Sequence, residues 1–106
     1  MTAAIVGWAH TPFGKLNGES VESLIVRVTA DALADAGIAA SDVDEIVLGH
    51  FNAGFSPQDF TASLVLQASP DLRFKRAVRV ENACAPGPAA VHQGLTSIAA
   101  GAARIV

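Results

Sequence analysis

The fold is decided by one stretch of the sequence, Ala77-Val-Arg-Val-Glu-Asn-Ala-Cys84-Ala-Pro-Gly-Pro-Ala-Ala-Val-His-Gln-Gly94. Its first part alternates as a strand does, with Val78 and Val80 on the side opposite Arg79. Small residues then crowd a corner, and apolar residues recur at helical spacing beyond it: Val91, Leu95, Ile98, Ala99 and Ala102. We therefore predict a strand over 77–82, a tight corner and then a helix.

The only cysteine of the chain, Cys84, falls in this corner, where the strand ends and the helix begins. A helix N-terminus carries unpaired N–H groups and a partial positive charge, and both stabilise a thiolate. The thiolate is the nucleophilic form of cysteine. Cys84 is therefore a candidate nucleophile. The alternative is an inert buried cysteine, and the corner position beside Asn82 favours the nucleophile.

Length and composition indicate one modest domain, because 106 residues with 51% apolar content suffice for a single core. The net charge of -3 argues against nucleic acid or an anionic membrane as the partner. No apolar run is long enough for a membrane span. A single cysteine forms no internal disulfide, and the start shows no leader sequence, so we expect a cytoplasmic protein.

The basic residues gather in one place, at Arg73, Lys75, Arg76 and Arg79. Two interpretations remain open. The cluster is either a solvated loop and strand edge, or a grip on an anionic ligand such as a nucleotide phosphate.

The first half of the chain reads as a strand, a helix and a strand. The apolar run 3–8 predicts a central strand covered on both sides. The period of residues 20–36 predicts a helix, with Ser20 as its cap and Gly37 as its stop. Residues 45–49 predict a second buried strand, and such a βαβ unit makes its two strands parallel. His50 and Asn52 follow this strand, and we interpret them as turn formers.

The second half before the cysteine contains another helix. Ser56 and Pro57 are typical of a helix start, and Pro70 requires the helix to end before Ser69. At the end of the chain, residues 103–106 resemble the opening of a further strand. We therefore expect the chain to be a fragment of a longer protein.

Three ordered segments resemble the thiolase superfamily, and within it the sterol-carrier-protein-2-type thiolases and their bacterial relatives. They are Ala4-Ile-Val-Gly-Trp-Ala-His-Thr-Pro-Phe-Gly-Lys15, Asp44-Glu-Ile-Val-Leu-Gly49 and the motif from Val80 to Gly94. The resemblance implies that residues 1–106 are the N-terminal part of the thiolase N-terminal domain. It implies an incomplete, layered α/β fold with a mixed sheet and βαβ units.

The same resemblance implies an acyltransferase of lipid metabolism in which Cys84 carries the acyl group of an acyl-CoA as a thioester. Coenzyme A enters as part of the substrate, so we expect no separate cofactor and no metal. The family takes its activating histidine, its second cysteine and much of its oxyanion hole from later segments. The 106-residue chain is therefore expected to be inactive alone. The strand at 77–82 would lie at a sheet edge and pair with its copy in a homodimer.

Two prolines depart from the family pattern, since relatives usually carry small or hydroxyl residues where this chain has Pro86 and Pro88. Each proline biases the preceding residue away from helical angles, which predicts a delayed helix start and a Cys84 removed from the helix end. His10 also stands where relatives often carry arginine. Two alternatives stay open: a thiolase-like subunit that binds acyl-CoA or cleaves carbon–carbon bonds with a small partner protein, and a standalone α/β interaction domain.

Overall fold

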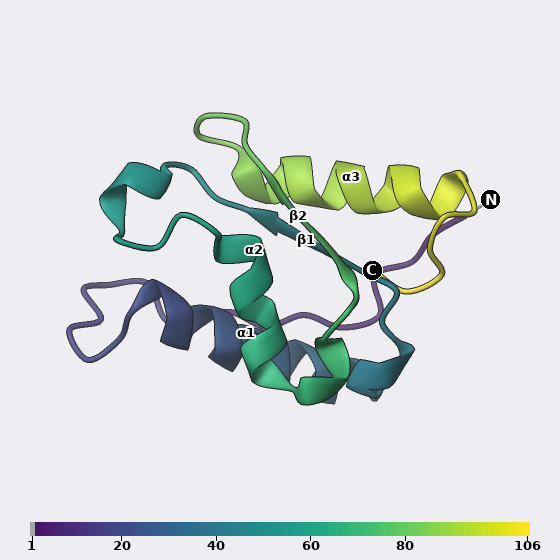
Figure 1. The fold of residues 1–106 in the computed structure, drawn as a ribbon, viewed down its shortest axis with the longest axis horizontal. Coiled ribbons are helices and arrows are strands. Elements are labelled where there is room, and N and C mark those ends of the chain that lie inside the picture. Colours follow the sequence, from purple (N-terminus) through teal and green to yellow (C-terminus); the bar gives the residue numbers. More distant parts are fainter. Residues whose placement is uncertain (1) are drawn as a thin grey trace.

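The computed structural model describes residues 2–106. Its helices and strands follow in the order α1 (Val21–Ala36), β1 (Glu45–Gly49), α2 (Thr61–Leu64), β2 (Arg76–Val80) and α3 (Pro86–Ala99). Four short 3-10 turns join them, namely η1 (Ala40–Asp42), η2 (Ala53–Phe55), η3 (Val65–Ala68) and η4 (Pro70–Leu72). Figure 1 shows the two strands between α3 on one side and α1 with α2 on the other. The predicted α/β class is confirmed.

Helix α1 forms as the sequence predicts, because both of its ends are fixed by local signals. Ser20 and Ser23 form a reciprocal capping box at the start. Gly37 ends the helix in the left-handed region at φ 66°, which glycine adopts without steric cost. The N–H of Ile38 then donates to the carbonyl of Leu33 at 3.2 Å.

Strands β1 and β2 form a parallel pair in which Glu45 lies opposite Arg76 and Gly49 opposite Val80. The predicted strand 45–49 is confirmed, and the strand predicted over 77–82 runs instead from Arg76 to Val80. Because the pair is parallel, both strands end at the same edge of the sheet. The chain leaves this edge toward α2 after β1 and toward Cys84 after β2.

The core lies beneath β1, on the side of α1 and η3. Its buried members come from four different segments, namely Val43, Ile46, Val65 and Leu72. Ile25 and Leu33 of α1 pack against this cluster. Leu72 is the most completely enclosed, with 2% of its surface exposed. The apolar face predicted for α1 is therefore the face that the fold uses.

The strand predicted over 3–8 is not formed, and the prediction is wrong. This segment lies along the C-terminal end of α1, where a Cβ on Gly7 would come within 2.6 Å of the Cβ of Ala36. The N–H of Trp8 donates to Asp35 at 3.0 Å. Ile5 is 81% exposed, so the segment is also not covered on both sides. Within residues 2–106 the sheet consists of β1 and β2, so 3–8 does not supply the first strand of the βαβ unit predicted for residues 3–49.

The second helix begins four residues later than its sequence signals suggest, with its N-cap at Phe60 instead of Ser56. The hydroxyl of Ser56 donates to the carbonyl of Gln58 at 3.1 Å instead of capping a helix. The N-cap position of α2 is Phe60, which has no side-chain cap hydrogen bond. The end is as predicted: Ser69, before Pro70, is extended at φ -160°.

Helix α3 packs on β1 through small residues. Its buried residues are Gly94 and Ser97, whereas Val91 and Leu95 are 51% and 42% exposed. A Cβ on Gly94 would come within 3.2 Å of the side chain of Val106, and a Cβ on Gly49 of β1 would overlap the carbonyl of Pro86. Both glycines therefore leave room for close packing around α3.

The last residues, 103–106, form no strand but lie beside the start of β1. The carbonyl of Ile105 accepts the N–H of Asp44 at 2.9 Å. The carboxylate of Asp44 in turn accepts the N–H groups of Arg104 at 2.7 Å and Ile105 at 3.1 Å. These two hydrogen bonds lower the pKa of Asp44 from its ordinary value, and the bond from Arg104 has the larger effect. Asp44 thus ties the chain end to the sheet.

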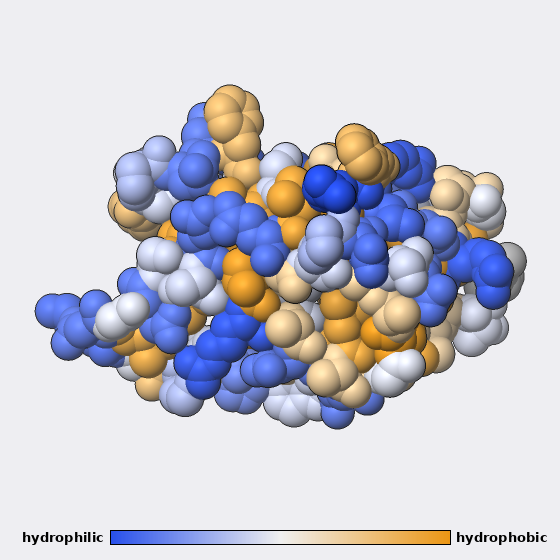
Figure 2. Space-filling view, turned by 60° about the horizontal axis from the view of Figure 1, so that its bottom comes forward, coloured by the Kyte–Doolittle hydropathy of each residue, from blue (hydrophilic) through white to orange (hydrophobic). Residues whose placement is uncertain are grey.

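Apolar groups remain open on the surface in several patches between charged side chains (Figure 2). Phe13 and Phe74 are almost fully exposed, at 99% and 98%. None of the helices in residues 2–106 combines the length and the apolar character that crossing a membrane requires.

Candidate active site

Cys84 is exposed in the corner between β2 and α3. The strand ends at Val80 and the first helical residue is Pro86, so the thiol stands just before the helix N-terminus. The predicted succession of strand, corner and helix is confirmed. The thiol is therefore open to a reagent or substrate and lies near the positive end of a 14-residue helix.

The corner is held by two hydrogen bonds on either side of an unusual backbone angle. Ala83 has φ 43°, in the left-handed region that costs a non-glycine residue about 1–2 kcal/mol. The N–H of Ala83 donates to Oε1 of Glu81 at 2.8 Å. The N–H of Ala85 donates to the carbonyl of Asn82 at 2.8 Å. Cys84 is thus flanked by two residues whose amides are fixed.

The predicted bias of the prolines is seen at Ala85, before Pro86, but not at Gly87, which is helical although Pro88 follows, so the helix begins at the first proline. Pro86 is the first helical residue, and Ala85, at φ -125° and ψ 47°, takes the non-helical N-cap position that a following proline requires. The prolines do reduce the number of donors at the helix end. Pro86 and Pro88 have no N–H, and the N–H of Ala85 donates to the carbonyl of Asn82. The N–H of Gly87 is therefore left without a partner in residues 2–106.

The first turn of α3 rests directly on the end of β1. A Cβ built on Gly49 would lie 2.1 Å from the carbonyl oxygen of Pro86, a distance at which no side chain fits. One residue further, the N–H of His50 donates to the carbonyl of Val80 at 3.2 Å. The ends of both strands therefore support the corner that carries Cys84.

The polar residues after β1 build the turn, as the sequence indicated. Oδ1 of Asn52 accepts the N–H of Gly54 at 2.8 Å. Nδ1 of His50 lies 3.3 Å from the hydroxyl of Thr61, which is completely buried. This contact was not predicted, because it joins the residue after β1 to the first residue of α2.

The basic cluster is engaged by the protein itself. Arg76 pairs with Glu45 at 2.9 Å and with the carbonyl of Ala102, and Arg79 pairs with Asp59 at 3.0 Å. Lys75 and Arg73 donate to the carbonyls of Ser41 and Pro70 at 3.0 and 3.2 Å. These contacts favour the structural interpretation of the cluster over a grip on a phosphate.

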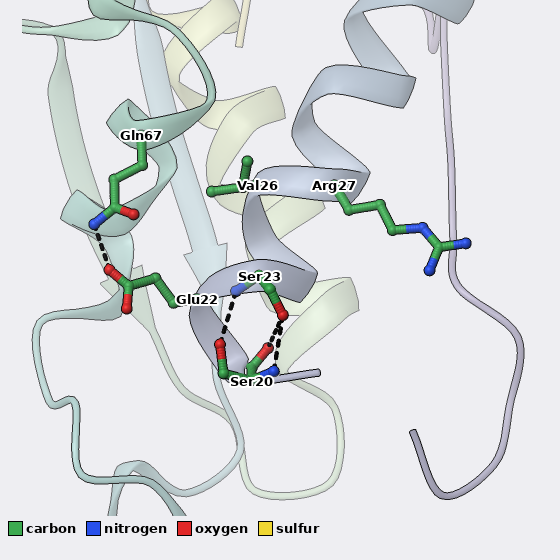
Figure 3. A pocket seen from close by; sticks show the side chains of 6 residues that line it. All are labelled: Ser20, Glu22, Ser23, Val26, Arg27 and Gln67. Atoms are coloured by element: carbon green, nitrogen blue, oxygen red, sulfur yellow. Dashed lines mark hydrogen bonds between the residues drawn. The ribbon is translucent and has the colours of Figure 1, made fainter. Parts of the chain in front are cut away.

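Two surface hollows lie away from the cysteine. The larger, of about 400 Å³, is at the start of α1, where Gln67 of η3 reaches Glu22 (Figure 3). The smaller, of about 230 Å³, is lined by Asp59 to Ser63 together with Ala77 and Arg79. Cys84 lines neither hollow, and in residues 2–106 no group of three His, Cys, Asp or Glu side chains could hold a metal ion.

The histidines of the chain take other contacts. His10 stacks on Trp8 with the ring centroids 5.1 Å apart, and its Nδ1 is 2.7 Å from the carbonyl of Thr11. The ring of His92 is on the exposed side of α3. Within residues 2–106, no side chain forms a hydrogen bond with the sulfur of Cys84.

Comparison with known sequences shows that nearly the whole chain matches one protein family. Residues 3–106 match the family described as "Thiolase, N-terminal domain". An acetyl-CoA acetyltransferase of Methanocaldococcus jannaschii is 39% identical over 104 residues, which are 97% of this chain and 26% of that protein. The enzyme of the same name from Methanothermobacter thermautotrophicus is 34% identical, over 97% of this chain and 27% of its own length. The chain thus spans about a quarter of these relatives.

Solved structures share the fold at lower sequence identity. The Acat5 thiolase from Ascaris suum, in complex with coenzyme A, superimposes with a TM-score of 0.74 at 22% identity, over 93% of this chain and 25% of that one. The 3-oxoacyl-[acyl-carrier-protein] synthase III from Aquifex aeolicus gives a TM-score of 0.67 at 24% identity, over 81% and 27% of the two chains.

Proposed function

Since this chain belongs to the thiolase N-terminal domain family, we propose that it is the nucleophile-bearing part of an acyl-CoA acyltransferase in lipid metabolism. The observation that carries the proposal is the position of Cys84, exposed in the corner before α3. The acetyl-CoA acetyltransferases among its relatives support the substrate class.

In the proposed reaction, the thiolate of Cys84 attacks the carbonyl carbon of an acyl-CoA thioester. A carbon–sulfur bond forms to Cys84, the bond to the sulfur of coenzyme A breaks, and coenzyme A leaves with a proton. A second acyl-CoA then loses a proton from its α-carbon to a base, and this carbon attacks the acyl group on Cys84. A carbon–carbon bond forms, the carbon–sulfur bond to Cys84 breaks, and the cysteine leaves as a thiolate. In the reverse direction, Cys84 accepts the acyl group of a 3-ketoacyl-CoA.

This chain supplies the nucleophile and its positioning. Cys84 stands just before the α3 N-terminus, and the open corner admits the thioester. The reaction also needs a base for the thiol proton and donors for the negative carbonyl oxygen. Because no side chain of residues 2–106 reaches the sulfur, we assign the base to another part of the protein.

We further propose a homodimer that pairs through β2, the strand predicted at 77–82. Arg76 to Arg79 are exposed along this strand, and an edge strand is a template for pairing with a second copy. Analytical ultracentrifugation of the complete protein over a dilution series tests this. A monomer at every concentration contradicts it. The free thiol fits a reducing compartment, and we place the protein in the cytoplasm.

A second candidate function rests on Pro86 and Pro88, which leave the α3 N-terminus fewer N–H donors. It is a thiolase-like subunit that binds acyl-CoA, or cleaves carbon–carbon bonds with a small partner protein, without standard thiolase activity. Binding of acyl-CoA by the complete protein without turnover would favour this candidate.

The experiment for the main proposal is thiolysis of a 3-ketoacyl-CoA by the complete protein. Cys84→Ala is expected to lower kcat by at least about 10³-fold, because the covalent step is lost. Thr96→Ala, a change on the exposed side of α3, serves as the control. Activity that survives in Cys84→Ala would overturn the proposal.

A further inference from the structure

We propose that Glu81 is a positioning residue, whose carboxylate oxygen holds the corner so that Cys84 points to its substrate. This inference rests on the proposed function of Cys84. Glu81 and Cys84 are separated by two residues, and the hydrogen bond from Ala83 to Glu81 spans the turn between them.

The backbone at Ala83 explains why the corner needs such a residue. Ala83 has φ 43°, in a region of backbone angles that alanine seldom adopts. Glycine and asparagine adopt this region more readily, but this position is an alanine. The N–H of Ala83 is the donor of the 2.8 Å bond to Oε1 of Glu81. Without that acceptor, Ala83 is free to relax to a negative φ, and such a rotation redirects Cys84.

The other contacts of the corner do not replace this bond. The bond from Ala85 to Asn82 closes the turn on the far side of Cys84, and the contact of Pro86 with Gly49 fixes only the helix. Glu81 is thus the side chain that determines the direction of the chain immediately before the cysteine.

Glu81 contributes both a charge and a hydrogen-bond acceptor, and two variants separate these contributions. Glu81→Gln keeps an oxygen acceptor and loses the charge, whereas Glu81→Ala loses both.

The test compares these variants in the complete protein by two measurements, the rate of Cys84 alkylation by iodoacetamide and the kcat for thiolysis. We expect Glu81→Ala to alkylate about two- to fivefold more slowly than Glu81→Gln, because its thiol leaves the helix end. We expect kcat to fall about tenfold in Glu81→Ala with KM unchanged, and to be retained in Glu81→Gln. Thermal melting of each variant verifies the fold.

The control is Asp35→Ala, because Asp35 also accepts a backbone N–H, that of Trp8 at 3.0 Å, but on α1. It is expected to leave both measurements unchanged. Equal alkylation rates in the two Glu81 variants, with equal kcat, would overturn the inference. Alkylation is measured on the thiol itself, so it decides the role of Glu81 even in a protein without thiolysis. Absence of thiolysis in the unaltered protein would instead count against the proposed function.

Discussion

Gly49 at the end of β1 faces the carbonyl oxygen of Pro86 at the start of α3, and a Cβ on Gly49 would lie 2.1 Å from it. This contact joins the sheet to the helix that follows the candidate nucleophile. Glycine is required here for space and not for its backbone angle, since Gly49 is a strand residue paired with Val80.

Gly49→Ala is therefore expected to push the first turn of α3 away from the sheet. Overpacking of this kind costs about 1–3 kcal/mol in the free energy of unfolding. Urea denaturation measures the cost. Gly18→Ala is the matched control, because a Cβ at Gly18 meets nothing within 4 Å, and its effect is expected within about 0.5 kcal/mol. Equal stability of the two variants would show that α3 does not rest on Gly49.

The ion pair between Glu45 and Arg76 provides a second test. Glu45 is 6% exposed, so Arg76→Ala leaves a buried carboxylate without its cation. We expect a loss of about 1–3 kcal/mol in the free energy of unfolding. Arg79→Ala removes a similar bond to Asp59, whose side chain is 69% exposed, and is expected to cost about 0–1 kcal/mol. Chemical denaturation of both variants compares them, and a larger loss for Arg79→Ala contradicts the burial argument.

Acid is expected to release the chain end from β1. The pKa of Asp44 is lowered in the folded protein, so its stabilising contribution is fully present above its ordinary value of 3.8. That contribution is lost as the pH falls through the lowered folded pKa. Hydrogen exchange at the amides of Arg104 and Ile105 measures the release. Their protection is expected to fall below pH 3.8 in the unaltered chain and to be weaker at pH 7 in Asp44→Ala. Equal protection of these amides in the unaltered chain and in Asp44→Ala at pH 7 would show that Asp44 does not hold residues 104 and 105.

Local signals predicted those elements that local interactions determine. Ser20 and Gly37 cap α1 within a few residues of its ends, and the alternation around Val78 identified β2. Ser56 and Pro57 did not predict the start of α2 correctly. The hydroxyl of Ser56 donates to the carbonyl of Gln58 instead of capping a helix, and a serine side chain can form either contact.

Long-range contacts determined the rest. The apolar run around Ile5 reads as a buried strand, but β1 pairs with β2 and the segment lies on α1. The spacing of apolar residues in α3 predicted the helix, but not that its buried residues are Gly94 and Ser97.

Within the candidate site, the position of Cys84 was predicted from pattern and resemblance together. The bond between Glu81 and Ala83 was not, because alanine gives no sign of a left-handed angle in sequence. Nothing in the spacing of Pro86 and Pro88 distinguishes a delayed helix from one that begins at the first proline. The structure shows the latter.

Mass spectrometry can show whether Cys84 carries the acyl group. The complete protein is incubated briefly with acetyl-CoA and digested with trypsin, which cleaves after Arg79 and Arg104. We expect one acetyl group on the peptide that contains Cys84, lost on addition of coenzyme A and absent from Cys84→Ser. Acyl transfer without that adduct, or transfer undiminished in Cys84→Ser, would contradict this role of Cys84.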